Sequence, residues 1–320
     1  MKVAMWVWVL VGIIIIICAG ITAIIALSSP QSPPTMESIA APFRSMDYSK
    51  LPPLSHFAAR DGVKLAYRFY IAPQPKQTVV LIHGSSAGST SMHALAQYLQ
   101  GQSITVYVPD MRGHGESGRK GDITYVGQLE DDLEDFVNQA LKGKQGVILV
   151  GFSAGGGFAL RFAGSSRQNL FNRYILLAPF IRYDAPTTRP NNSQWANASV
   201  PRIIGISLLG SLGEKLFGQL PVLAFAIDPK TAQYQTATYS YRLWSNFGPH
   251  YNYKADMKAA KQPITVMIGK DDELFYPQKY LPVFAASQPH AEITIVPDVG
   301  HITLISDKAG LKAIAEQLSH

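Results

Sequence analysis

The chain has 320 residues, of which 47% are hydrophobic and 16% are charged, so it is long enough to bury the core of one large domain. Its net charge is +6, but the Lys and Arg residues are scattered and form no run that would follow a phosphate backbone, which argues against a nucleic-acid partner. The single cysteine, Cys18, lies in an apolar N-terminal run, so the rest of the chain can form neither an internal disulfide nor a thiolate metal site.

The N-terminal run, residues 3–27, contains no charged side chain, and as a helix it would extend over about 37 Å. Because a bilayer's hydrocarbon core is about 30 Å thick, we expect a single transmembrane anchor over residues 1–28. A cleaved signal peptide is the alternative, but its apolar part has only about 7–15 residues. Lys2 precedes the run and no Lys or Arg follows before Arg44, which predicts a cytoplasmic N-terminus and a main domain outside the cytoplasm.

Residues 29–54 are rich in Pro and Ser and show no hydrophobic period, so we interpret them as a linker that holds the domain off the membrane and carries no chemistry. The folded domain is expected over residues 55–320. A β-hairpin is predicted at its start, because two alternating segments, 56–60 and 63–70, flank the turn dipeptide Asp61-Gly62.

Short β-rich segments mostly separated by helical stretches follow the hairpin. This alternation predicts repeated βαβ units, and therefore an α/β fold with a mostly parallel sheet covered by helices on both faces. Such sheets carry their functional sites at the carboxyl ends of the strands. The predicted strands are residues 78–83, 104–109, 147–150, 174–178, 264–269 and 293–296.

Residues 146–163 predict a buried strand that turns sharply into an apolar helix, with Gly-Phe-Ser-Ala-Gly at the bend. This pattern is typical of a nucleophile elbow, in which a serine occupies strained backbone and small residues are needed two positions before and after it. Ser153 is therefore the expected nucleophile, with Gly151 and Gly155 in the two small positions. The N–H of Ala154, at the start of the helix, is placed to donate to an oxyanion.

A serine nucleophile needs a base and an acid that orients the base. His301, in a loop after the last predicted strand, is the expected base. The acid is expected after the strand at 264–269, where three carboxylates are adjacent. Asp272 is our choice, and Asp271 is the alternative, which would otherwise cap the following turn. The order Ser, Asp, His is that of the α/β-hydrolase fold.

Several segments together resemble the α/β-hydrolase enzymes of the monoacylglycerol-lipase and lysophospholipase-like group over about residues 55–320. The resemblance implies that the N–H of Ser85, after His-Gly, is the second oxyanion donor beside Ala154. It also implies that His83 and His114 brace the site without a catalytic role, and that no metal ion or organic cofactor is needed. The matching segments are Leu-Ile-His-Gly-Ser-Ser (81–86), Val-Pro-Asp-Met-Arg-Gly-His-Gly-Glu-Ser (108–117), Gly-Phe-Ser-Ala-Gly (151–155), Gly-Lys-Asp-Asp (269–272) and Val-Gly-His (299–301).

The segment between the sixth and seventh strands, about residues 180–262, is too long for a structureless connection, so we expect a helical cap over the site. Within it, residues 203–227 are rich in apolar side chains and carry only Glu214 and Lys215 as charges. They form either an acyl-binding lid or bilayer-facing surface, or ordinary cap helices packed on the core. A second transmembrane span is disfavoured, because four glycines and two central charges interrupt the run.

The sequence therefore predicts a membrane-anchored serine hydrolase that cleaves carboxylic esters through an acyl-enzyme on Ser153. The expected partner is a small-molecule or lipid ester, such as a lysophospholipid or monoacylglycerol. A peptidase or amidase of the proline-iminopeptidase-like type is one alternative, although the cap shows no acidic cluster for a peptide amine. A catalytically silent binding protein is the other.

Overall fold

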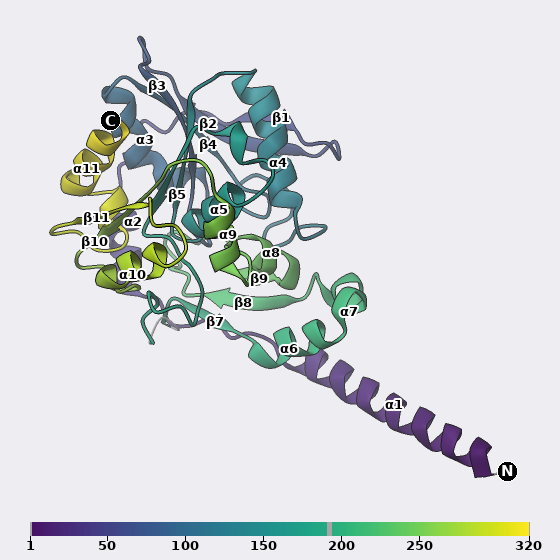
Figure 1. Cartoon of the computed structure of the whole chain (residues 1–320). Helices are drawn as coiled ribbons and strands as arrows, with labels where there is room; N and C mark the ends of the chain where they lie inside the picture. Colours follow the sequence, from purple (N-terminus) through teal and green to yellow (C-terminus); the bar gives the residue numbers. More distant parts are fainter. Residues whose placement is uncertain (1, 191–193, 320) are drawn as a thin grey trace.

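The computed structural model describes residues 2–190 and 194–319, and its centre is an eight-stranded sheet in the order β1-β2-β4-β3-β5-β6-β10-β11 (Figure 1). The pairs from β4 through β11 are all parallel, and β2 is antiparallel to both β1 and β4. This arrangement confirms the expected mostly parallel sheet. The strands are β1 (Ser55–Ala58), β2 (Lys64–Tyr70), β3 (Gln77–Ile82), β4 (Ile104–Pro109), β5 (Val147–Phe152), β6 (Arg173–Leu177), β10 (Ile264–Gly269) and β11 (Glu292–Val296).

The strands in the middle of the sheet are buried on both faces, which is why their residues are almost all apolar. The hairpin at the sheet edge forms as predicted. Gly62 has a φ of 81°, and Ala59 and Val63 close the turn through a backbone hydrogen bond of 2.9 Å.

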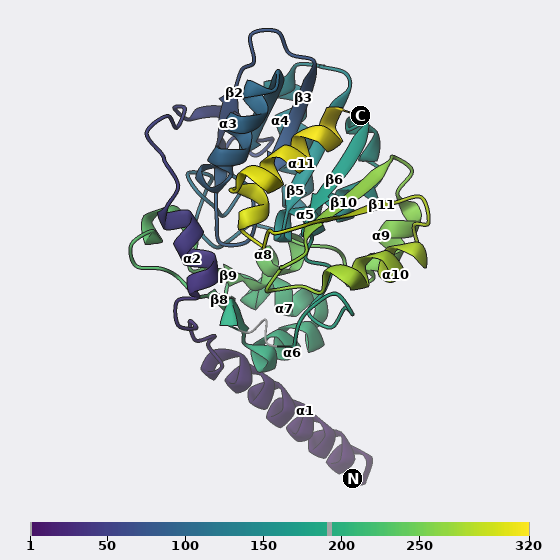
Figure 2. The same cartoon turned by 90° about the vertical axis from the view of Figure 1, so that its left-hand side faces the viewer.

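Helices cover both faces of the sheet (Figures 1 and 2). On one face α3 (His93–Gly101) and α11 (Lys308–Ser319) pack together, and on the other lie α4 (Gln128–Phe136) and α5 (Ala154–Ala163). Further helices that pack around the main sheet are α9 (Tyr253–Ala259), which contacts α5, and α10 (Tyr280–Ala285). Shorter helical turns are the π-helical turn Val137–Leu141 and the 3-10 turns Ser89–Met92, Gln168–Leu170, Pro277–Lys279 and Thr303–Ile305.

The cap is inserted between β6 and β10, and it contains a small antiparallel sheet, β7-β8-β9, as well as the expected helices. Backbone hydrogen bonds join it to the loops beside the main sheet, from Thr236 N–H to the Ser86 carbonyl and from Ser240 N–H to the Gly121 carbonyl, both 2.7 Å. Its elements are β7 (Ala196–Ala198), α6 (Val200–Leu208), α7 (Gly210–Phe217), β8 (Pro221–Phe225), the 3-10 turn Ala232–Tyr234, β9 (Thr238–Ser240) and α8 (Tyr241–Asn246).

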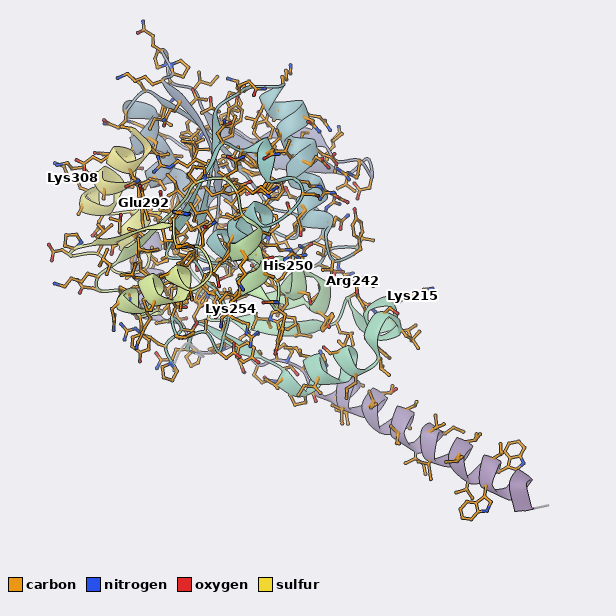
Figure 3. The ribbon with its side chains drawn as sticks, viewed as in Figure 1. Lys215, Arg242, His250, Lys254, Glu292 and Lys308 are labelled. Atoms are coloured by element: carbon orange, nitrogen blue, oxygen red, sulfur yellow. The ribbon has the colours of Figure 1, made fainter. Side chains whose placement is uncertain are left out.

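The guanidinium of Arg242 from α8 donates hydrogen bonds to the carbonyls of Glu214 and Lys215 in the last turn of α7. Figure 3 shows Arg242 and Lys215 close together at this corner of the cap. A positive charge at a helix carboxyl end satisfies free carbonyls and complements the helix dipole. This contact fastens the end of α7 to the rest of the cap.

The long apolar helix α1 (Lys2–Leu27) projects from the end of the molecule that carries α6 and α7 (Figure 1). Within it, Trp6–Leu27 is long and apolar enough to cross a membrane, and it is almost entirely exposed. Its last turns pack on α6, where Ile25 is fully buried and its carbonyl accepts a 2.7 Å hydrogen bond from Arg202. Gly205 permits this approach, because a Cβ there would lie 2.8 Å from the Ile25 side chain.

The segment expected as a linker, residues 29–54, differs from that expectation, because it contains the helix α2 (Glu37–Arg44) and packs on the domain. Ile39 and Ala40 are buried. The pattern was missed because α2 has only eight residues with Pro42 inside, which is too short for a helical period to stand out. The domain is also not held off α1 by a free spacer, since α1 itself contacts α6.

Candidate active site

The sharp turn between β5 and α5 places Ser153 at the carboxyl edge of the sheet. Its backbone has φ 54° and ψ −117°, a conformation that costs a residue other than glycine about 1–3 kcal/mol. The flanking glycines are sterically required. A Cβ on Gly151 would lie 2.2 Å from the Gly155 carbonyl oxygen, and one on Gly155 would lie 2.3 Å from the His83 carbonyl oxygen. The predicted elbow is therefore present.

Three side chains from separate loops meet at this turn. His301 Nε2 lies 3.0 Å from Ser153 Oγ, and His301 Nδ1 lies 2.8 Å from Asp272 Oδ2. All three residues are buried, and the imidazole packs against the rings of Phe152 and Phe275. Because a carboxylate only accepts hydrogen bonds, Nδ1 carries the proton and Nε2 is left as an acceptor for the serine hydroxyl.

The three adjacent carboxylates after β10 have separate surroundings. Asp272 is fully buried, and its Oδ1 accepts hydrogen bonds of 2.9 and 2.8 Å from the backbone N–H groups two and three residues further on. Glu273 instead accepts from the backbone N–H of His301, at 2.9 Å. Asp271 is exposed. Asp272 is thus the carboxylate that contacts His301, and it also makes the turn contact proposed for Asp271 as the alternative.

The two expected oxyanion donors flank Ser153. Ser85 lies in the loop after β3 and lines the same cavity as Ser153, and its hydroxyl accepts a 3.0 Å hydrogen bond from the indole of Trp195 in the cap. Ala154 is the first residue of α5, where an N–H has no acceptor within the helix. The positive end of the helix dipole therefore points at the site.

His83 fixes the peptide that carries the Ser85 N–H. The backbone N–H of Met111 donates to His83 Nε2 at 3.1 Å, so the proton lies on Nδ1, which donates to the Gly84 carbonyl at 2.8 Å. That carbonyl and the Ser85 N–H belong to one peptide unit. Complete burial lowers the pKa of His83, which keeps the imidazole neutral in this role.

A second buried network joins the cap to the same loop. The Ser86 N–H donates to the hydroxyl of Tyr239 at 2.6 Å, and that hydroxyl contacts His114 Nε2. Burial lowers the pKa of His114 and raises that of Tyr239, so both are neutral and the phenol donates to the imidazole. Sequence reasoning gave Tyr239 no specific role, because the contact joins residues 125 positions apart.

A small cavity of about 30 Å³ lies beside Ser153. One of its walls was not foreseen from the sequence, because α2 contributes Ile39 and Phe43. The cap that the sequence predicts over the site contributes Trp195 and Gln235. Among residues 2–190 and 194–319, no group of three or more His, Cys, Asp or Glu side chains is arranged to hold a metal ion. The remaining lining residues are Gly84, Ser85, Ala87, Ser91, Phe152, Leu274, His301 and Ile302.

Comparison with known proteins places this site in a family. Residues 73–308 match the family described as "Serine aminopeptidase, S33". The chain is 30% identical to a monoacylglycerol lipase of Mycolicibacterium smegmatis over 131 residues, which is 39% of this chain and 46% of that protein. It is 29% identical to the human monoglyceride lipase over 142 residues, 43% of this chain and 46% of that protein. The matched part thus spans less than half of these relatives.

Solved structures share the fold over most of the chain. A soluble variant of the monoglyceride lipase from Saccharomyces cerevisiae aligns with a TM-score of 0.65 and 20% identity, covering 86% of this chain and 97% of that one. A crystal structure described as a putative aryl esterase of Burkholderia cenocepacia aligns with a TM-score of 0.60 and 18% identity, covering 83% and 98%. With its sheet, its elbow serine and a family match over most of its length, the chain belongs to the S33 serine aminopeptidase family of α/β hydrolases.

Proposed function

We propose that this protein is a serine hydrolase that cleaves carboxylic esters through an acyl-enzyme on Ser153. The observation that carries the proposal is the continuous hydrogen-bonded chain from Ser153 Oγ through the His301 imidazole to the Asp272 carboxylate. A hydroxyl, a neutral imidazole and a buried carboxylate in this geometry are the parts that acyl transfer requires.

In the first half of the reaction, Ser153 Oγ attacks the ester carbonyl and His301 Nε2 takes the hydroxyl proton. Asp272 stabilises the resulting imidazolium and holds its ring orientation. The N–H groups of Ser85 and Ala154 donate to the oxyanion, and the imidazolium then protonates the leaving alcohol. In the second half, water loses a proton to His301 and attacks the acyl-enzyme, which releases the carboxylic acid and restores Ser153.

Ester cleavage fits the cavity better than removal of an amino-terminal residue from a peptide, the activity that the family's description names. The charged amine of a peptide amino terminus is best held by a carboxylate beside the nucleophile. Within the described part of the chain, the cavity lining contains no carboxylate, and Asp272 is occupied by His301. The relatives with lipase names support the same choice. A silent binding protein is disfavoured, because it would have no need of strained backbone at Ser153.

We also propose that the substrates are lipophilic and reach the enzyme at a membrane anchored by α1. An apolar surface on α6 and α7, next to the buried end of α1, supports this proposal. It comprises side chains that are each more than half exposed, and such a face is suited to rest on a bilayer. With Lys2 as the charge that precedes the span, the catalytic domain lies outside the cytoplasm. The surface residues are Val200, Ile204, Leu208, Leu212 and Leu216.

Turnover by the full-length protein tests the reaction class. We expect hydrolysis of short and medium-chain acyl esters, and no release of amino acids from peptides with a free amino terminus. Faster cleavage of peptides than of every ester tested would support the peptidase alternative. Amino-terminal sequencing of the membrane fraction separates an anchor, which retains Lys2, from a signal peptide, which is removed.

Vesicle assays test the bilayer-facing surface. Leu208→Asp and Leu212→Asp should slow cleavage of esters embedded in vesicles and leave cleavage of dissolved esters unchanged, because a carboxylate on this face resists insertion. Ile71→Asp is the matched control, since Ile71 is equally exposed but follows β2, outside the cap. Equal losses in the control and in the Leu208 and Leu212 variants would contradict a specific role for this face.

A further inference from the structure

The short helix α2 contributes to the catalytic cavity although it lies outside the residues that match the family. The match begins at residue 73, whereas α2 covers Glu37–Arg44. Ile39 and Phe43 are four residues apart, so they lie on the same face of the helix, and both line the cavity that holds Ser153 and His301. An element that the family match leaves out therefore forms one wall of the site.

Polar contacts tie α2 and the residue before it to the cap. Arg44 Nε lies 2.7 Å from Asp228 Oδ2, whose side chain is almost fully buried, and Arg44 also pairs with Glu37 within α2. The hydroxyl of Thr35, just before the helix, donates to the Ile227 carbonyl at 3.2 Å. Both cap contacts are to the segment after β8, so the position of α2 depends on the cap.

The space beside Ser153 depends on this wall. With Ile39 and Phe43 in place, the cavity measures about 30 Å³, which is small beside the roughly 300–1,000 Å³ of sites that enclose a whole small-molecule ligand. The neighbouring lining side chains Phe152 and Leu274 come from the end of β5 and from the loop after β10 that carries Asp272. Both pack close to the catalytic groups. The cap wall is tied to the site by the hydrogen bond from Trp195 to Ser85, so α2 is the wall that can yield without disturbing Ser153, His301 or Asp272.

We propose that α2 is the acyl-facing wall of the substrate site, and that Ile39 and Phe43 are specificity-determining residues that limit how much acyl chain the site admits. This inference rests on the proposed ester hydrolysis at Ser153. The acyl chain of a longer ester occupies space that these two side chains fill in the structure, so it is accepted only as α2 moves away. The Arg44–Asp228 ion pair resists this movement.

An acyl-length series on the full-length protein tests the proposal. We would measure kcat/KM for p-nitrophenyl acetate, butyrate and octanoate with Ile39→Ala and Phe43→Ala. Each variant should raise the octanoate-to-acetate ratio, by about fourfold for every methylene newly accommodated, which corresponds to about 0.8 kcal/mol. Arg44→Met, which removes the ion pair without touching the cavity, should shift the ratio in the same direction by less.

Ser38→Ala and Ala41→Ser are the matched controls, because both residues are on the exposed side of α2. They should keep the wild-type ratio. If Phe43→Ala fails to fold, Phe43→Leu and Ile39→Val make the same test with smaller deletions. An unchanged ratio in the folded variants, with ester turnover retained, would overturn the role of α2. Failure of the underlying reaction has a different signature, which is wild-type protein that cleaves no ester at all.

Discussion

The two sides of the catalytic cavity are specified in different ways. On one side, β5, the elbow and α5 are adjacent in the chain, and the geometry is imposed locally by Gly151, Ser153 and Gly155. On the other side, α2 and the cap reach the cavity from separate parts of the chain and are held by side-chain contacts such as Arg44–Asp228 and Trp195–Ser85.

This difference separates chemistry from selectivity. The elbow admits almost no change, because a single methyl group on either glycine would collide with backbone atoms. The opposite wall is made of apolar side chains whose size can vary without moving Ser153. Variants on the elbow side should therefore abolish turnover, and variants on the α2 side should change which esters are turned over.

The largest effect is expected for the nucleophile and its base. Ser153→Ala and His301→Ala should each lower kcat by about 10⁶-fold, and the double variant should be no slower than either single one, because the two groups act as a unit. Steady-state kinetics on a short ester measures this, with circular dichroism to show that the fold is retained. A double variant far slower than both single variants would count against one cooperating unit.

The next effect distinguishes the neighbouring carboxylates. Asp272→Asn should lower kcat by about 10⁴-fold, because the amide no longer stabilises the imidazolium and favours the wrong tautomer of His301. Asp271→Asn is the matched control and should stay near wild type, since Asp271 is exposed. A large loss of kcat in Asp271→Asn would mean that the wrong carboxylate had been assigned to His301.

A smaller effect is expected where the cap meets the loop after β3, which carries Ser85 and Ser86. Tyr239→Phe leaves the Ser86 N–H and His114 Nε2 without their shared partner, and unsatisfied buried groups cost about 1–3 kcal/mol of stability. Thermal unfolding should show this loss, together with a lower kcat. Tyr241→Phe is the control, because it removes only an exposed hydrogen bond to Ser207. Equal unfolding temperatures for the two variants would contradict a structural role for the network.

The effect that is smallest at neutral pH is a pH dependence of stability. Burial lowers the pKa values of His83 and His114 below the ordinary value of 6.5, so below this pH the unfolded chain binds protons that the folded protein does not. The free energy of unfolding is therefore unaffected by these two groups above about pH 7. Below that pH it falls with decreasing pH, by up to about 1.4 kcal/mol per pH unit for each histidine. Melting temperatures from pH 8 to 5 measure the slope. His56→Gln, at an exposed position, should not change it, whereas a His114 variant should.

Much of the main sheet and of the candidate site could be predicted, because both depend on local pattern. The strand predicted at 147–150 is the core of β5, and Ser153, Asp272 and His301 follow strands whose ends meet at one sheet edge. The unpredicted parts depend on contacts between distant residues. The eight residues of α2 carry too short a pattern, β7 and β9 have three residues each, and Tyr239 acquires its role only through His114 and Ser86.

Labelling with a fluorophosphonate, followed by peptide mapping, tests the central claim most directly, because this probe reacts only with an activated serine. We predict that the full-length protein is labelled on Ser153 and on no other residue, that Ser153→Ala abolishes labelling, and that Asp272→Asn slows it far more than Asp271→Asn. Absence of labelling in the folded wild-type protein, or labelling of a different serine, would contradict the proposal that Ser153 is the nucleophile of a hydrolase.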